Sequence, residues 1–174
     1  MATKTKCQRL TDLLLDVETI RREQKDRVAH KLLLALQEHG FLKVAKRFDG
    51  QRESASIIRF ERQNNDHTYD WVEAMFCKYL GRKFQISMGK NSTGAPHAPI
   101  RTGNLVRRKG QLYHFWGARA WLPFRDAAFG RACKRVVGIA PQVVRFLETG
   151  QAGRNVCGRE WTLEDLKKGG WLES

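Results

Sequence analysis

Three segments of this chain alternate apolar and polar residues, and this alternation limits the fold more than any other feature. They are residues 41–48, 56–63 and 83–90; in the last of them Phe84 and Ile86 alternate with polar neighbours. Successive side chains of a β-strand point to opposite faces, so each segment is predicted to be a strand with one buried face. Such strands need helices to cover the apolar face of their sheet. The sequence therefore predicts an α+β protein.

Helical spacing of apolar residues predicts the elements that cover this sheet. Helices are expected over residues 10–20, 28–39, 69–80, 122–137, 141–148 and 162–168. Two of them are followed by a glycine, Gly40 and Gly81, which is the commonest residue just after a last helical turn. Two short strands are expected over residues 104–109 and 111–117, after a loop over residues 91–103.

The length and composition suit one globular domain with a helical extension at each end. With 174 residues, of which 41% are hydrophobic, the chain can bury one substantial core. The expected parts are an N-terminal helical extension (1–24), a central domain (25–150) and a C-terminal helical tail (151–174). No run of 18 apolar residues occurs, and the N-terminus lacks the apolar core of a signal peptide. We therefore expect an intracellular protein, cytoplasmic or nucleoid-associated, with no membrane partner.

The cysteines do not form a metal-binding or disulfide pattern. They are Cys7, Cys77, Cys133 and Cys157. They are far apart and include no CxxC pair, which favours ordinary reduced thiols. No histidine shares a close spacing with them, so no zinc site and no other cofactor is predicted.

The net charge of +14 comes entirely from one part of the chain, residues 78–159, which we call the acid-poor segment. It holds sixteen Lys and Arg residues but only two acidic ones, Asp126 and Glu148. A merely solvated surface mixes both signs of charge, whereas a segment almost without acids creates a positive potential that attracts a polyanion. The sequence therefore predicts a nucleic-acid-binding protein whose contact surface lies in this segment.

The predicted contact residues form two groups. Outward positions of the strands would present cations, hydrogen-bond donors and acceptors to base edges in a groove: Lys43, Arg47, Arg59, Glu61, Lys83, Gln85, Ser87 and His114. Cations in and after the loops would contact phosphates: Arg101, Arg107, Arg108, Lys109, Arg131, Lys134 and Arg135. The neighbouring Tyr113, Phe115 and Trp116 also suit stacking on unpaired bases, although alternating core aromatics explain Tyr113 and Phe115 more simply.

The predicted element order, αββαββα after the N-terminal helix, resembles half of the LAGLIDADG homing-endonuclease fold. The resemblance rests on residues 32–40 (LLLALQEHG), which lead directly into the first strand, and on residues 57–63 (IIRFERQ), which lead into a helix ending at Gly81. It covers residues 28–129. In that family the name-giving helices of two repeats pack at a dimer axis, and each places an acidic residue, just before the terminal glycine, at the metal.

The matching position in this sequence is His39 rather than an acid. The resemblance therefore implies a curved antiparallel sheet that forms a DNA-binding saddle without the nuclease chemistry. With a single repeat, it also implies a homodimer on a two-fold or near two-fold site. We expect a sequence-specific binder of double-stranded DNA, a non-cleaving homing-endonuclease derivative that acts in transcription regulation as a repressor or as an architectural factor, with no catalytic residue.

Three alternatives remain at this point. A helix-turn-helix would place helices at residues 42–48 and 52–60. An active, metal-dependent DNA endonuclease would use Glu38, Glu61 and Gln63 around Mg²⁺. An RNA-binding component of a ribonucleoprotein would account equally well for the basic charge.

Overall fold

The protein is described as a computed structural model, covering residues 23, 26–44, 57–76, 83–94, 98–112, 114–117 and 125–168. Within these residues the chain is α+β, as predicted, with a seven-stranded antiparallel sheet and helices. After a helix over residues 26–37 the elements are β1 (Leu42–Val44), β2 (Ile57–Gln63), β3 (Thr68–Phe76), β4 (Lys83–Ser92), β5 (Pro99–Leu105), β6 (Trp116–Gly117), α2 (Arg125–Thr149), β7 (Val156–Glu160) and α3 (Leu163–Lys168).

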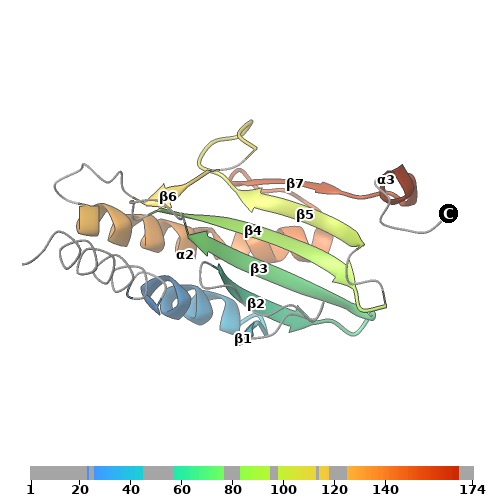
Figure 1. Ribbon diagram of the computed structural model, residues 1–174, viewed down its shortest axis with the longest axis horizontal. Coiled ribbons are helices and arrows are strands. Elements are labelled where there is room, and N and C mark those ends of the chain that lie inside the picture. The colour runs from blue at the N-terminus through green and yellow to red at the C-terminus, as the bar shows by residue number, and fades with distance from the viewer. Residues whose placement is uncertain are drawn as a thin grey trace, which may run out of the picture.

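The strands follow the order β1-β2-β3-β4-β5-β7, and the short β6 pairs with the start of β4. In Figure 1 the long helix α2 runs behind the sheet, and the helix over residues 26–37 lies below it. Both helices bury their apolar faces in one core with the strands; that core includes Leu32, Phe60, Ile86, Phe129 and Phe146. The strands β2, β3 and β4 each supply alternate residues to it, as expected for strands with one face on the core.

The segment predicted as a helix over residues 69–80 is the central strand β3 as far as Phe76, and residues 77–80 lie outside the described residues. Val72 and Ala74 point to the core, while Tyr69 and Glu73 of the opposite face are buried as well. A strand buried on both faces loses the simple apolar and polar alternation, so its residues also fit a helical pattern. The helix prediction was wrong for this reason.

This strand also affects the two hypotheses based on element order. Because β3 occupies the place of the middle helix, the described elements do not follow the αββαββα order. The resemblance to homing endonucleases therefore stays an untested hypothesis. The helix-turn-helix alternative is wrong where the structure describes it, because Leu42–Val44 and Ile57–Gln63 are strands. The predicted helix over residues 10–20 and the segment 45–56 lie outside the described residues.

The two helices predicted over residues 122–137 and 141–148 form one helix, α2, which contains Pro141. Proline lacks the N–H that would bond to the preceding turn, and this usually favours a break. Here Pro141 is exposed, whereas Ala140, Val143 and Val144 beside it are buried. Burial of this apolar face offsets the missing hydrogen bond, since packing supplies most of the stability of helices in proteins.

The predicted C-terminal tail contributes a strand as well as a helix. Its residues 156–160 form β7, which pairs with β5 through partners that include Gly103 and Gly158. The Phe146 ring of α2 lies against this glycine pair: a Cβ at Gly103 would lie 3.0 Å from the ring, and one at Gly158 would overlap it. The tail is therefore part of the same sheet, and only its final helix, α3, agrees with the prediction.

Two further boundaries differ from the prediction. The loop expected over residues 91–103 is shorter, because β4 continues to Ser92 and β5 already begins at Pro99. The strand expected over residues 111–117 is reduced to Trp116–Gly117. Among the described residues no helix combines the length and apolar character needed to cross a membrane.

Candidate nucleic-acid interface

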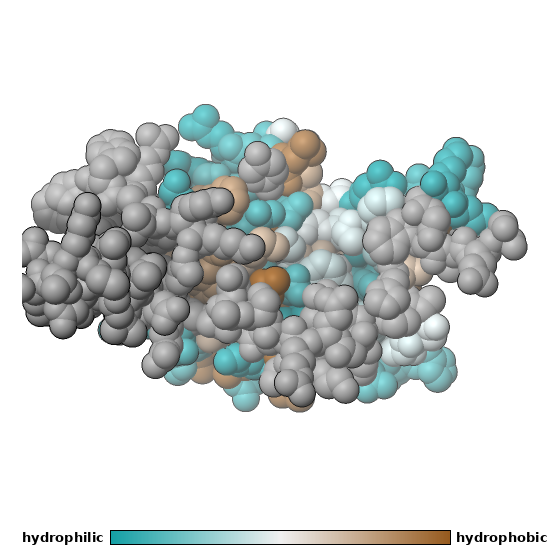
Figure 2. All heavy atoms as spheres, viewed as in Figure 1, coloured by the Kyte–Doolittle hydropathy of each residue, from teal (hydrophilic) through white to brown (hydrophobic). Residues whose placement is uncertain are grey.

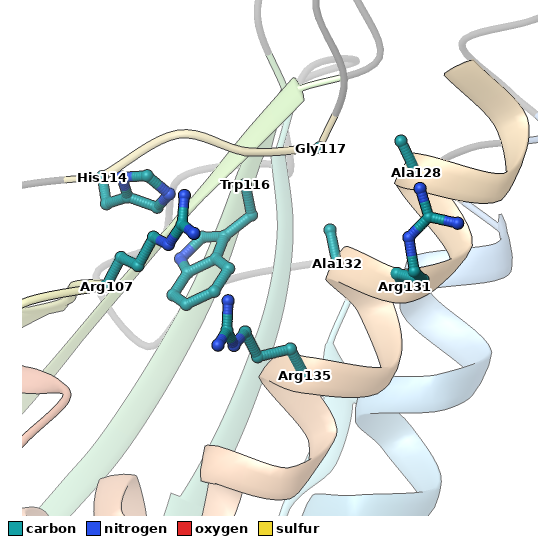
Figure 3. Close-up of a pocket in the computed structure, with 8 residues that line it drawn as sticks. All are labelled: Arg107, His114, Trp116, Gly117, Ala128, Arg131, Ala132 and Arg135. Atoms are coloured by element: carbon teal, nitrogen blue, oxygen red, sulfur yellow. The ribbon is translucent and has the colours of Figure 1, made fainter. Parts of the chain in front are cut away.

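A pocket of about 370 Å³ lies between α2 and the segment that joins β5 to β6. Its described lining residues are Arg107, His114, Trp116, Gly117, Ala128, Arg131, Ala132 and Arg135. Figure 3 shows that Arg131 and Arg135 come from one helix, four residues apart, whereas Arg107 reaches toward them from the end of the sheet. The pocket therefore gathers four of the residues predicted to bind nucleic acid: Arg107, His114, Arg131 and Arg135.

The lining is strongly cationic. Its three arginines are exposed to solvent, and none of the described lining residues is acidic. Like charges held in one concave site repel one another and raise the local concentration of anions. In Figure 3 the guanidinium groups of Arg107 and Arg135 lie on either side of the Trp116 ring, and that of Arg131 lies beside Ala128. Such an arrangement favours an anion within the pocket.

Two aromatic side chains form the wall between these arginines. The rings of His114 and Trp116 meet edge to face, with 4.9 Å between their centroids. Burial lowers the pKa of His114, and the charges of Arg107 and Arg135 lower it further. The imidazole is therefore held in its neutral form to lower pH than an ordinary histidine.

Further cations surround the pocket. Arg108 and Lys109 follow Arg107 in the loop after β5, and Lys134 lies between the two pocket arginines of α2 in sequence; all three side chains are exposed. We call the six cations together the basic surface: Arg107, Arg108, Lys109, Arg131, Lys134 and Arg135. In Figure 2 hydrophilic residues gather above the sheet, where the β5–β6 segment projects in Figure 1.

Arg101 does not belong to this surface, although the sequence predicted a phosphate contact. Its side chain is buried, with 9% of the residue exposed, and it pairs with Glu160. Nη1 donates to the carbonyl oxygens of Phe146, at 2.9 Å, and Leu147, at 2.7 Å, in the last turn of α2. The carbonyls of a last helical turn lack partners within the helix and carry partial negative charge, so this cation caps the helix. The predicted role was wrong because the charge is satisfied inside the fold.

Arg59 and Glu61 were expected to project from the sheet, and this expectation is also wrong. Only 2% of Arg59 and 4% of Glu61 is exposed. Arg59 donates to Glu61, at 2.5 Å, and to Glu73 on β3, at 2.8 Å, and its guanidinium lies over the ring of Trp71. A buried guanidinium needs such partners, so these residues form a structural ion-pair network rather than a contact surface.

The remaining strand positions lie in different places. Gln85 and Ser87 both donate to Asn104 Oδ1, at 3.2 and 2.9 Å, on the face opposite the helices, and Lys83 is half-buried. Lys43 is exposed, and it pairs in register with Phe60, whose side chain is in the core. Because directly paired residues point to the same face of a sheet, Lys43 lies on the helix-covered face, whereas Gln85 and Ser87 lie on the opposite one. Arg47 lies outside the described residues. The structure therefore does not bring the predicted base-reading residues together on one face.

The residues named for an active nuclease differ in their exposure to solvent. Glu38 and Gln63 are exposed, and Glu61 is the buried partner of Arg59. Within the described part of the chain no three His, Cys, Asp or Glu residues lie close enough to hold a metal ion. The described cysteines, Cys133 and Cys157, are free thiols, and the other two lie outside the described residues.

A second charged cluster, around Arg62, was not predicted from the sequence. This side chain donates to Asp70 at 2.6 Å, to the His39 carbonyl at 3.0 Å and to Glu148 at 3.1 Å. Burial raises the pKa of Asp70, and Arg62 and Lys90 oppose that shift. Because its charges are mixed and join the end of the first helix, the sheet and α2, we assign this cluster to stability. Asp70 was missed because its segment was predicted to be helical.

Comparison with protein-family models, with curated proteins and with solved structures gives no match to this chain.

Proposed function

We propose that this protein binds nucleic acid through the phosphates, using the basic surface. The observation that carries the proposal is the convergence of cations from the β5–β6 segment and from α2 around one pocket without a described acidic lining residue. Lys and Arg that neutralise phosphates supply most of the non-specific affinity for a nucleic acid, because they release condensed counterions.

The spacing of charge along α2 supports the same function. Between its first-turn Asp126 and its last-turn Glu148 the helix contains four basic residues and no acidic one. Arg131, Lys134 and Arg135 are exposed, and their spacings of three and four residues place them on one face of the helix, away from its buried residues. The helix therefore offers a continuous positive face to a strand of phosphates, and it joins the loop cations at the pocket.

Duplex DNA as the ligand, and a homodimer as the binding form, are further parts of this proposal that come from the sequence resemblance. A role as a repressor or architectural factor would require a preferred site. Since Arg59 and Glu61 are buried, selectivity for such a site would come from the loops or from the shape of the duplex rather than from these two side chains.

The test uses cations of the basic surface that do not line the pocket. The double variant Arg108→Ala/Lys109→Ala should bind a duplex more weakly than the wild type. Its plot of log affinity against log salt concentration should be shallower by about 1 to 2 units, since each neutralised phosphate of B-DNA contributes about 0.9. Fluorescence anisotropy with labelled duplex DNA and labelled structured RNA, from 50 to 300 mM salt, measures both quantities.

The matched control is Lys167→Ala/Lys168→Ala, which removes the same charge from two exposed lysines of α3. It should change the salt dependence little, because α3 is not part of the basic surface. An unchanged slope in the Arg108/Lys109 variant, or an equal loss in the control, refutes the assignment of the surface. A much larger effect on RNA than on DNA would assign the protein to RNA.

A further inference from the structure

A buried tryptophan, Trp116, forms part of the pocket wall. Trp116 is buried, with 3% of the residue exposed, and its Nε1 has no hydrogen-bond partner among the described residues. Most buried donors in proteins are paired, because an unpaired one loses its hydration without compensation. Trp116 lines the pocket and lies between Arg107 and Arg135 in Figure 3. The Nε1 atom itself is closed to solvent, so Trp116 contributes an apolar wall to the pocket rather than a free donor.

The polar groups that line the pocket are donors. Each guanidinium presents several N–H groups and accepts nothing, and a neutral imidazole still donates one N–H. Since the lining combines three guanidinium groups with His114 and holds no described acidic residue, it suits a ligand that is rich in acceptors and carries negative charge. Arginine is the residue best suited to binding a phosphate group with paired hydrogen bonds.

The shape of the site distinguishes it from a simple phosphate contact. A phosphodiester in the middle of a strand can be bound by protruding side chains on an open surface. This site is instead a pocket of about 370 Å³, at the small end of the volumes that enclose whole ligands. A group that projects from the end of a strand, or from a free nucleotide, can enter it. A terminal phosphate carries about −1.5 to −2 charges near neutral pH, more than the single charge of a diester.

We infer that the pocket between α2 and the β5–β6 segment binds the terminal phosphate monoester of a nucleic-acid strand. The inference rests on the proposed function and specifies which part of the nucleic acid this pocket recognises. Arg107 and Arg135 hold the phosphate oxygens, and the Trp116 ring lies between them as the wall of the site. The phosphate also offsets the two arginine charges that act on His114, so the imidazole gains a proton more readily in the complex.

The experiment compares one labelled oligonucleotide in two forms, with a 5′-phosphate and with a 5′-hydroxyl. The wild-type protein should bind the phosphorylated strand about tenfold more tightly or better, since charge-assisted hydrogen bonds are lost with the phosphate. The variant Arg107→Gln/Arg135→Gln should lose this preference. The control Arg108→Gln/Lys134→Gln removes the same charge from the same segments outside the pocket lining, and it should keep the preference while binding both strands more weakly.

Two measurements identify the source of the phosphate and the site. Unlabelled AMP should compete with the phosphorylated strand only at much higher concentration; competition at equal concentration would mean that the pocket serves free nucleotides, which overturns the strand-end assignment. In NMR titrations the pKa of His114 should rise when the phosphorylated strand binds.

The possible failures are distinct. Equal binding of both strands by the wild type, with AMP causing no shift at His114, overturns this inference and leaves the proposed function intact. No binding of either strand overturns the proposed function itself. Loss of the preference in the control as well as in the pocket variant shows that net charge, not the pocket, selects the phosphorylated strand.

Discussion

Replacing Arg101 by methionine tests whether this residue caps a helix or contacts nucleic acid. Methionine keeps the apolar stem but removes the two hydrogen bonds to the last turn of α2 and the pair with Glu160. Phe146 O also accepts from the Gly150 N–H at 2.9 Å, so it keeps one partner, whereas Leu147 O depends on Arg101. We therefore expect a loss of stability and no direct loss of phosphate contacts.

The magnitude follows from these contacts. A hydrogen bond to a charged group contributes about 1.5–3 kcal/mol, and a cation at a helix C-terminus contributes about 0.3–1 kcal/mol. The pair with Glu160 adds little, because that carboxylate is 59% exposed. Since one carbonyl retains a partner, the expected cost is about 3 kcal/mol. For a chain of this length that corresponds to a fall in Tm of about 6–12 °C.

Urea denaturation followed by far-UV circular dichroism measures the change in free energy of unfolding. The control Glu160→Gln should cost less than about 1 kcal/mol, because it removes only the exposed partner. Arg101→Met should also bind the oligonucleotides with unchanged salt dependence at a temperature where it is folded. A cost for Arg101→Met no larger than that of the control, or a shallower salt dependence, would show that the capping role is wrong.

Two further predictions concern packing and thiol chemistry. Gly158→Ala should destabilise the fold by about 1–3 kcal/mol, because its Cβ overlaps the buried Phe146 ring. Gly130→Ala, where a Cβ meets open space, should instead stabilise α2 by about 0.5–1 kcal/mol. Urea denaturation measures both changes, and equal effects of the two substitutions would contradict the prediction. Burial raises the pKa of the Cys133 thiol to about 11, so iodoacetamide at pH 8 should leave it largely unmodified in the native protein but not in urea, while the half-buried Cys157 reacts earlier. Peptide mass spectrometry measures both rates, and equal rates for Cys133 in the two conditions would refute the prediction.

The sequence predicted the strands best where apolar and polar residues alternate, whether or not the polar face is exposed. The alternation over residues 83–90 corresponds to β4, and that over residues 56–63 corresponds to β2. It failed for β3, where Trp71, Val72, Met75 and Phe76 also fit the spacing of a helix. A central strand packs on both faces, and that burial comes from its neighbours rather than from its own residues.

The candidate site shows the same division between local and tertiary information. The four-residue spacing of Arg131 and Arg135 predicts that they share a helix face. Nothing in the sequence indicates that Arg107 meets them, because this depends on how α2 crosses the end of the sheet. Arg101 belongs to the same acid-poor segment as Arg107, yet it reaches the end of α2 and is satisfied there. Charge alone therefore indicates a candidate segment of the chain but not which of its arginines are free to bind a ligand.

The pairing of β5 with β7 has a consequence for synthesis of the protein on the ribosome. The β6 segment and α2 both separate β7 from β5 in the chain, so β5 remains the open edge of a nascent sheet for a few seconds at about 5–20 residues per second. Open edges invite pairing with other chains, and proline and charged residues reduce that risk. Pro99 and Arg101 lie in β5. The same arginine that later caps α2 therefore also helps to protect the growing chain from aggregation before β7 is made.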